Sequence, residues 1–535
     1  MDRRMFLALG ASGAALAASN GCVPAMPASP TATPAGLRSR PHADLEEASV
    51  ADLSARMTRG ELTSRDLVAR YIARIDALDR SGPALRSVLE TNPDALAIAA
   101  QLDAERRVKG ARGPLHGIPV LLKDNIDTGD RMQTTAGSLA LAGSPAPRDA
   151  HLVTRLRAAG AVVLGKTNLS EWANIRDAHS TSGWSARGGL TRNPYALDRN
   201  TSGSSSGSAA AVAASLCAVA VGTETDGSIM SPSQIQGLVG LKPTVGLVSR
   251  AGIIPISHTQ DTAGPMARSV ADAAILLGVL AGVDPHDPAT TGARAATDYT
   301  ASLDRSAARG KRLGVLRPSW MGPTVKPSFE AALDALRQLG AVLVDVEAPK
   351  ADTEEAELTV LLTELKADLA IYLAARGHPT LRTLDDVVRF NSAHAREELA
   401  VFGQELFEKA LAKGNLDSPE YKQALATCRR LSRDEGLDAL LATHTLDALV
   451  TPTGGPAWLT DVVNGDSFTG AGYGLAAVAG YPSITVPCGA AHGLPVGLCL
   501  MAAAWSEPTL LALAFAFEQE TRHRTPPTYA ETVRF

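Results

Sequence analysis

Apolar and polar positions alternate between two regular spacings over most of this chain. In residues 61–79 the apolar positions recur every three or four residues, which predicts a helix with Thr63 or Ser64 at its N-cap. Residues 117–125 ("GIPVLLKDN") form a short apolar run that ends in charge, as a buried strand does. Residues 151–168 predict a helix, a glycine turn and a strand, and residues 326–347 repeat that order. This interleaving predicts an α/β protein built on one large sheet.

The C-terminal half follows the same plan with one exception. Residues 482–489 and 494–502 predict two strands joined by a glycine-containing loop, and a helix is expected from Ser506 to Gln519. Residues 351–446 have helical spacing and many charges almost throughout. We expect this segment to form a helical cover over one side of the sheet. No linker divides residues 44–535, so we expect them to form one domain.

The first 43 residues differ from the rest. Arg3 and Arg4 directly precede an apolar, alanine-rich run, a pattern that resembles a twin-arginine export signal over residues 1–22. The run is too short for a stable membrane span. Residues 23–43 are rich in proline and alanine and predict a tether. We therefore expect an exported protein, periplasmic or extracellular, with Cys22 as a candidate site for a lipid anchor.

The composition and charge of the chain limit the classes of partner that we expect it to bind. The formal net charge of −5 lacks the basic excess of a nucleic-acid-binding protein. The five cysteines have neither a C-x-x-C motif nor zinc spacing, so we expect no metal or other cofactor, and we interpret the cysteines as small buried apolar residues. The expected partner is a small molecule or peptide, and the expected state is a monomer.

Residues 203–207 match G-x-S-x-G, in which Ser205 would be the nucleophile of an α/β-hydrolase. That motif needs a hydrophobic strand before it, and residues 192–202 are polar and contain proline. A P-loop would need a lysine after Gly207, and a flexible linker would not continue into an alanine-rich buried helix. Ser205 is therefore interpreted as a structural hydrogen-bonding residue or a contact for the substrate.

The segment 202–246 ("SGSSSGSAAAVAASLCAVAVGTETDGSIMSPSQIQGLVGLKPTVG") resembles the sequence that names the amidase signature family. Ordered motifs outside it support the resemblance, at residues 115–127, 165–173, 261–274 and 479–501. The resemblance implies a single large mixed β-sheet flanked by helices on both faces. It also implies hydrolysis of carboxamides through an acyl-enzyme.

By this resemblance, Ser228 is the nucleophile, Ser204 relays its proton after a cis peptide bond from Gly203, and Lys123 is the base. The two serines lie 24 positions apart, which fits the family. A lysine base must be neutral, so its pKa must fall by roughly 3 units from about 10.4, and burial causes shifts of that size.

The resemblance also places an oxyanion hole on the backbone N–H groups of Thr225, Asp226, Gly227 and Ser228. Many family members have glycine where this chain has Asp226, which either caps the turn or shapes the pocket. His116 suggests a Ser-His-Asp triad, but no particular aspartate is indicated as its partner, so we interpret it as structural.

Residues 182–195 and 247–269 look most like bacterial peptide amidases, which remove the C-terminal amide of peptides and release ammonia. Residues 450–466 are similar to the same group, and Trp458 is a candidate pocket wall. An amidase for small aryl, fatty or aliphatic amides is an alternative. The transamidation subunit that makes glutaminyl-tRNA has the same triad, but an export signal argues against it. A catalytically silent binding protein would be expected to lack one of the triad residues, and all three are present.

Overall fold

The computed structural model describes residues 40–349 and 353–533. Contacts divide the chain into Met1–Arg40 and Pro41–Phe535, and the helices and strands of the described residues all lie in the second unit. The predicted export signal, with Cys22, and all but the last few residues of the predicted tether lie outside the described residues. In the described part of the chain, no helix is both long and apolar enough to cross a membrane.

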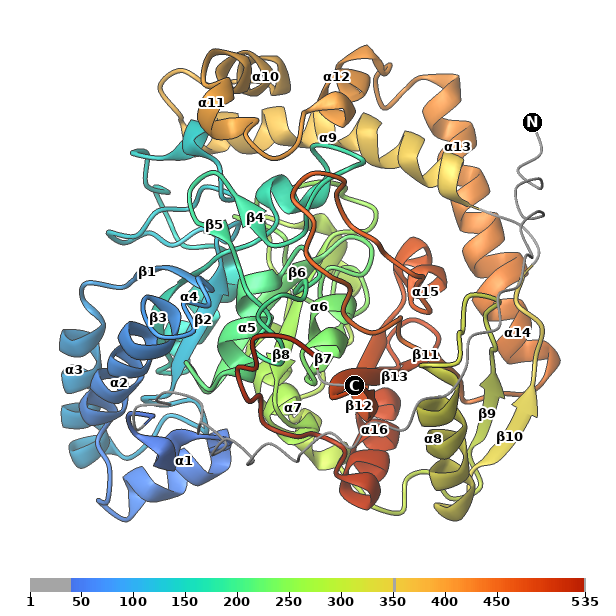
Figure 1. The fold of residues 1–535 in the computed structure, drawn as a ribbon, viewed down its shortest axis with the longest axis horizontal. Coiled ribbons are helices and arrows are strands. Elements are labelled where there is room, and N and C mark those ends of the chain that lie inside the picture. Colours follow the sequence, from blue (N-terminus) through green and yellow to red (C-terminus); the bar gives the residue numbers. More distant parts are fainter. Residues whose placement is uncertain (1–39, 350–352, 534–535) are drawn as a thin grey trace, which may run out of the picture. The chain divides into compact units, whose positions relative to one another are not determined.

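One mixed sheet of eleven strands runs through the second unit (Figure 1). In spatial order its strands are β1 (Val88–Thr91), β3 (Val162–Thr167), β2 (Pro119–Lys123), β6 (Val219–Glu224), β8 (Thr262–Ala267), β7 (Val239–Lys242), β12 (Ser483–Ala491), β13 (Leu494–Met501), β11 (Ala448–Pro452), β9 (Arg312–Val315) and β10 (Val342–Asp345). A separate short pair consists of β4 (Trp184–Ser185) and β5 (Gly189–Leu190). The single large sheet expected from the interleaved pattern is confirmed.

The parallel pairs of this sheet lie in two groups, separated by antiparallel pairs. β2 is parallel to both β3 and β6, and β9 is parallel to both β10 and β11. The predicted C-terminal hairpin is the antiparallel pair β12–β13, which turns at His492 and Gly493, both with positive φ. Because β2, β3 and β6 run in the same direction, their carboxyl ends at Lys123, Thr167 and Glu224 meet at one edge. In open sheets with parallel strands, ligands bind beyond such an edge.

Helices cover both faces of the sheet. α4 (His151–Ala158), α7 (Val270–Leu280), α16 (Glu507–Thr521) and α8 (Lys326–Gln338) contact one another in that order. α5 (Ser206–Ala213) and α6 (Met230–Ile235) contact each other and the central strands. The remaining helices of the sheet region are α1 (Val50–Thr58), α2 (Ser64–Arg74), α3 (Ala95–Lys109) and α15 (Gly474–Ala479). Of the two predicted N-cap candidates, Thr63 is the N-cap, since its side chain accepts a bond from the Asp66 amide, and Ser64 is the first residue of the helix.

Every residue of α5 is buried, which fits its composition of alanine, serine, glycine and valine. A helix without a polar face belongs in the interior of a protein. α5 begins directly after Ser204 and Ser205, so the serine-rich loop is held at the centre of the molecule.

The predicted helical cover consists of α9 (Glu354–Arg376), α10 (Leu384–Ala393), α11 (Ala395–Glu398), α12 (Glu405–Ala412), α13 (Pro419–Arg429) and α14 (Asp438–Thr443), with a π-helical turn between the last two. α9 to α13 lie together along one side of the view in Figure 1. α9 and α11 bond to loops that follow the central strands: Tyr372 to Asp127, Asp368 to His258, and Glu398 to Ser138. This part of the cover therefore packs on loops beyond the strand ends, where we had expected it to lie over a side of the sheet.

Candidate active site

Lys123 is the last residue of β2 and is completely buried. Its Nζ lies 2.8 Å from Ser204 Oγ and 2.8 Å from Thr223 Oγ1, and it donates to the Thr223 carbonyl at 3.2 Å. Burial lowers the pKa of Lys123 to about 7, and the charges of Asp261 and Glu224 oppose that shift only in part. Near neutral pH, a large fraction of this amine is unprotonated and able to accept a proton.

Ser204 follows a cis peptide bond from Gly203, as the resemblance implied. A side chain at Gly203 would collide with Ser170 Oγ, so the approach of these two loops requires glycine. The Ser170 amide donates to the Ser204 carbonyl at 3.1 Å. These contacts hold the buried Ser204 with its hydroxyl against the Lys123 amine.

Ser228 lies in the loop after β6, 8% exposed and on the wall of a pocket. Its carbonyl accepts a bond from the Ser205 amide at 3.1 Å. Three residues further on, Ser231 Oγ lies 2.7 Å from Ser202 Oγ. The loops that carry Ser204 and Ser228 are therefore joined at two points, beside the pocket.

The buried Glu224 carboxylate bonds to backbone amides at the end of the loop 225–228. One oxygen of Glu224 accepts bonds from the amides of Ile229 at 2.7 Å and Met230 at 2.9 Å, and the Gly227 amide faces the same carboxylate. Gly227 has φ +77°, and a side chain there would overlap the ring of Tyr473. Only glycine fits this turn.

Asp261 also bonds to this loop, at Thr225. One oxygen of Asp261 accepts a bond from the Thr225 hydroxyl at 2.5 Å, and the other accepts from the amides of Ile256 and Ser257. Burial raises the pKa of Asp261 to about 6, so this carboxyl is mostly ionised above neutral pH. Asp261 fixes Thr225 relative to the segment 256–257.

Asp226 extends from this loop into the pocket. Its side chain is exposed to the pocket while protein surrounds it closely, and the loss of hydration raises its pKa well above the ordinary value. The neighbouring charges of Glu357 and Glu224 raise the pKa further, and Lys242 opposes them. Asp226 is thus part of the wall of the same pocket as Ser228, two positions before it in the chain.

We call the pocket beside Ser228 the front pocket; its volume is about 260 Å³. Trp458 lines it, with its ring edge-on to Phe468 at 5.7 Å between centroids. Trp458 Nε1 donates to Asp466 at 3.2 Å, and Asp466 also accepts a bond from the Ser182 amide. The candidate wall residue therefore lies where a substrate beside Ser228 would touch it.

Ser205 does not line the front pocket. It is fully buried, and its hydroxyl donates to the Thr223 carbonyl at 3.1 Å and accepts from the Thr223 amide at 3.2 Å. His116 is also buried, within bonding distance of the Leu102 carbonyl and the Arg112 amide. Both residues occupy structural positions.

Sequence reasoning missed several residues of the site. Asn125 follows Lys123 by two positions and bonds to Thr223, which precedes Thr225 by two. Each therefore lies two positions from a residue that the motifs singled out, and this nearness in sequence is a usable signal for both. Asp261 and Tyr473 reach the site from distant segments. Asp261 begins the motif at residues 261–274, which did not indicate its bond to Thr225, and no local pattern marks Tyr473.

Among the described residues, two groups bring metal-binding side chains together: Asp177, His179 and Glu405, and His258, Glu364 and Asp368. In the second group, the Glu364 oxygens already accept bonds from Tyr421 and Ser257. His258 Nδ1 lies within hydrogen-bonding distance of Asp368 Oδ2, at 2.8 Å. This group fastens the loop 257–259 to the helical cover.

The described cysteines also have structural positions. All four, Cys217, Cys428, Cys488 and Cys499, are buried and unpaired. Burial raises the pKa of the Cys217 thiol to about 12, so this side chain is not a nucleophile near neutral pH.

Comparison with known proteins agrees with this geometry. A family model described as amidase matches residues 66–511. A probable amidase of Arabidopsis thaliana is 42% identical over 498 residues, covering 91% of this chain and 92% of that protein. A putative amidase of Schizosaccharomyces pombe is 38% identical over 528 residues, covering 91% of this chain and 88% of that protein.

Solved structures are similar over the same region. The peptide amidase PAM, crystallised with the competitive inhibitor chymostatin, superposes with a TM-score of 0.89 at 58% identity, over 91% of this chain and all of that one. The native peptide amidase of Stenotrophomonas maltophilia gives a TM-score of 0.87 at 58% identity, over 90% and 99% of the two chains. The chain belongs to the amidase signature family and is an amide-hydrolysing enzyme.

Proposed function

We propose that the enzyme hydrolyses its amide through a triad of Ser228, Ser204 and Lys123. Neutral Lys123 accepts the Ser204 proton as Ser204 accepts the proton of Ser228, and Ser228 Oγ bonds to the substrate carbonyl carbon. The negative charge on the carbonyl oxygen is stabilised by the backbone amides of residues 225–228. A proton returns through Ser204 to the leaving nitrogen, the C–N bond breaks, and ammonia and an acyl-enzyme result. Water then hydrolyses the ester through the same groups.

The observation that carries this proposal is the 2.8 Å contact between Lys123 Nζ and Ser204 Oγ in a fully buried site. A buried ammonium ion would require a compensating carboxylate nearby. Lys123 instead bonds to two hydroxyls and a carbonyl, and its pKa is about 7. This environment favours the neutral base that the reaction needs.

We propose that the substrates are peptides with a C-terminal amide. The support is the 58% identity to the peptide amidase PAM over 91% of this chain, together with a front pocket that has aromatic walls at Trp458, Phe468 and Tyr473. Small aryl, fatty or aliphatic amides are the alternative. We also propose that the enzyme is exported, with residues 1–22 as the signal and residues 23–43 as a tether. The support for this is that Arg3 and Arg4 precede an apolar run.

The deciding experiment measures ammonia release from amidated dipeptides, free asparagine and glutamine, and aryl amides. We expect the highest kcat/KM with the dipeptide amides. Ser228→Ala should abolish release, while Ser392→Ala, on the exposed surface of α10, should match the unmodified protein. Retained activity in Ser228→Ala would contradict the triad, and a preference for aryl amides would contradict the substrate class alone.

Export is tested separately by cell fractionation. Replacing Arg3 and Arg4 with lysine should leave the protein in the cytoplasm, because the paired arginines carry the proposed signal. Equal export of the variant would contradict the proposed signal without affecting the triad.

A further inference from the structure

The front pocket beside Ser228 is acidic. Of the described residues, those that line it include the carboxylates of Asp226 and Asp466 and no lysine, arginine or histidine. Asp466 is already bonded, since it accepts from the Ser182 amide and from Trp458 Nε1. The Asp226 carboxylate has charge interactions, but neither a hydrogen bond nor an ion pair joins it to a described residue. It is therefore available to a molecule in the pocket.

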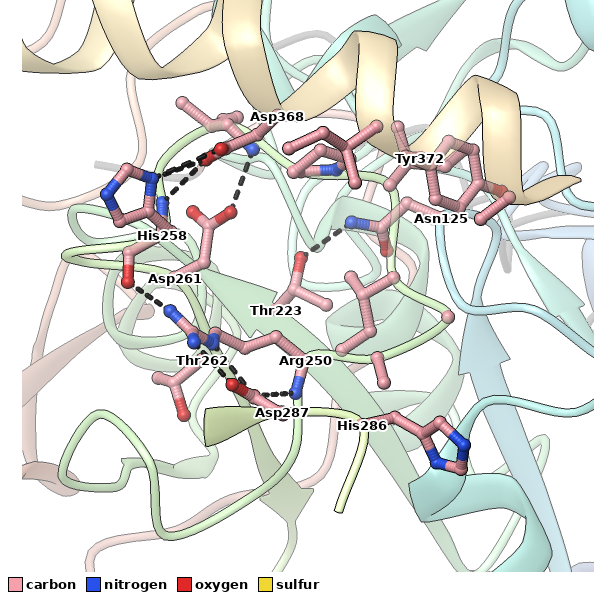
Figure 2. A pocket seen from close by; sticks show the side chains of 18 of the residues that line it. Asn125, Thr223, Arg250, His258, Asp261, Thr262, His286, Asp287, Asp368 and Tyr372 are labelled. Atoms are coloured by element: carbon pink, nitrogen blue, oxygen red, sulfur yellow. Dashed lines mark hydrogen bonds and ion pairs between the residues drawn. The ribbon is translucent and has the colours of Figure 1, made fainter. Parts of the chain in front are cut away.

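A second cavity, of about 330 Å³, contains carboxylates with basic partners (Figure 2). Arg250 Nε donates to Asp287 Oδ2 at 2.9 Å, and His258 Nδ1 lies 2.8 Å from Asp368 Oδ2, as the dashed lines in Figure 2 show. In that cavity the protein itself compensates both carboxylates. Asp226 differs from them, because a basic partner for its carboxylate has to come from a bound molecule.

Glu357 of the helical cover adds a second carboxylate near Asp226. Gln260 Nε2 donates to Glu357 Oε1 at 2.8 Å and to the Thr225 carbonyl at 3.4 Å, which places Glu357 beside the loop of Asp226. Leu361 lies four positions further along α9, on the same face, and lines the front pocket. The like charge of Glu357 raises the pKa of Asp226. Two such carboxylates at one pocket attract a cation into it.

Lys242 opposes these negative charges only in part, since the pKa of Asp226 is raised in spite of it. Lys242 is completely buried, and its Nζ donates to the Pro243 carbonyl at 3.3 Å. Its charge also acts on Glu224 and Glu507. One buried ammonium group thus serves several carboxyl groups, and the front pocket keeps a negative character.

The aromatic part of the wall suits a positive group on an apolar stem. Trp458, Phe468 and Tyr473 line the front pocket, and the first two rings meet edge-on. Aromatic faces attract ammonium groups, and they also pack against methylene groups. An alkylammonium group therefore matches both the charge and the apolar surface of this pocket.

We infer that the front pocket recognises an alkylammonium group on the acyl part of the substrate, with Asp226 as the residue that binds it. The inference rests on the proposed function, because it takes peptide amides as the substrates. In such a substrate the positive charge lies on a lysine side chain of the amidated residue or on a free α-amino group. Asp226 lines the same pocket as Ser228, so its carboxylate acts on which substrate binds there.

The test compares kcat/KM for ammonia release within two matched pairs of dipeptide amides at pH 7. N-acetyl-leucyl-lysinamide and N-acetyl-leucyl-norleucinamide differ in the side-chain ammonium group. Leucyl-norleucinamide and its N-acetyl derivative differ in the α-ammonium group. The readout is the ratio of the charged to the neutral substrate in each pair, so that a general loss of activity in a variant cancels.

We expect a ratio of about ten in the unmodified protein for at least one pair, because a charge pair that loses water on binding contributes strongly to selectivity. Asp226→Asn should bring that ratio to within about twofold of one, and Asp226→Glu, which restores the carboxylate, should recover most of it. Glu355→Gln is the matched control and should keep the ratio, since Glu355 is an exposed carboxylate of α9 that does not line the front pocket.

The unmodified protein alone is able to overturn the inference, even if the Asp226 variants do not fold. If the neutral dipeptide amides release ammonia and both ratios are near one or below it, cation recognition is wrong and the proposed function stands. A ratio that Asp226→Asn leaves unchanged would overturn the role of Asp226. If no dipeptide amide releases ammonia while aryl amides do, the proposed substrate class is wrong and the inference is rejected with it.

Discussion

Two neighbouring strands each carry a completely buried lysine near their carboxyl ends. Lys123 ends β2, and Lys166 is the penultimate residue of β3. In the parallel pairing Leu122 is opposite Lys166, so the two lysine side chains lie on different faces of the sheet. In sequence both follow a short apolar run, and nothing in those runs distinguishes them.

Their surroundings differ in charge. Lys166 Nζ donates to the Ile126 carbonyl at 2.6 Å and to Thr134 Oγ1 at 2.8 Å, with the charges of Asp124 and Asp127 close by. Burial lowers its pKa, and both carboxylates oppose that shift. Those carboxylates compensate a charged lysine, so Lys166 is suited to holding the loop 124–134 in place.

Lys123 also has hydroxyl and carbonyl partners, but fewer carboxyl groups act on its charge. The carboxyl groups that act on its charge, Asp261 and Glu224, are each bonded to other groups. The comparison teaches that burial alone does not make a lysine a base. The number of carboxyl groups whose charges act on the amine matters as much.

Replacing each lysine with methionine is the strongest test of whether the two lysines have different roles. Lys123→Met should lower kcat/KM by about 10³-fold, because it removes the proposed general base. Lys166→Met should keep activity within a few fold per folded molecule and lose less stability than the about 3–5 kcal/mol of a fully unpaired buried charge, because Asp124 and Asp127 lose one compensating charge and keep Arg187 and Arg376. Ammonia release and urea unfolding check the two variants. Equal loss of activity in both would end the distinction between base and structural lysine.

The adjacent serines extend the comparison to the residues around the base. Ser204→Ala should lower kcat by about 10²-fold or more, with little change in unfolding, because the proton relay is lost. Ser205→Ala should instead cost about 1–2 kcal/mol of stability, because both of its bonds to the Thr223 backbone are lost, and it should reduce kcat by less than tenfold. Steady-state kinetics and thermal unfolding separate the two. A Ser205→Ala variant as inactive as Ser204→Ala would assign the relay to the wrong serine.

Local pattern was enough to predict much of this fold. The helix capped at Thr63, the hairpin β12–β13 and the buried α5 follow from apolar spacing and capping residues, which act within a few positions of each other. The family motifs then singled out Lys123 and the loops of Ser204 and Ser228. The structure brings these segments together, although they are separated by up to about a hundred residues.

Contacts between distant segments were not predictable in the same way. Asp261 bonds to Thr225, and Tyr473 covers Gly227, and no local pattern in their own segments indicated either contact. The helical cover was predicted as helical, but its place over the loops depends on bonds such as Tyr372 to Asp127, which join positions 245 residues apart. Such contacts are set by how preformed elements dock, and short-range pattern does not encode docking.

The pH dependence of activity and stability tests whether Lys123 is neutral in the folded protein. The effects expected here are smaller than those of the substitutions above. Because the pKa of Lys123 is about 7, kcat/KM should rise about tenfold between pH 6 and pH 8 as the amine loses its proton. In the unfolded chain the lysine stays protonated to about pH 10.4. The unfolded state therefore binds more protons between about pH 7 and 10, and the free energy of unfolding should rise there by up to about 1.4 kcal/mol per pH unit.

The control for this prediction is Lys123→Met, which should lose that part of the slope. Urea unfolding of both proteins at pH 7, 8 and 9 measures the difference. An identical slope in the variant would mean that Lys123 is protonated in the folded protein throughout this range, as expected of a lysine in a carboxylate cluster.

The smallest expected effect concerns the Thr223 hydroxyl beside Lys123. Thr223→Val removes Oγ1, which contacts Lys123 Nζ and accepts a bond from Asn125, while the backbone carbonyl partner of Lys123 stays in place. One lost bond of this type is worth about 1 kcal/mol, so kcat should fall about fivefold with KM unchanged. Thr223→Ser restores the hydroxyl and should recover most of the rate. If the serine variant is as slow as the valine variant, packing of the Thr223 methyl group, and not its hydroxyl, supports the base.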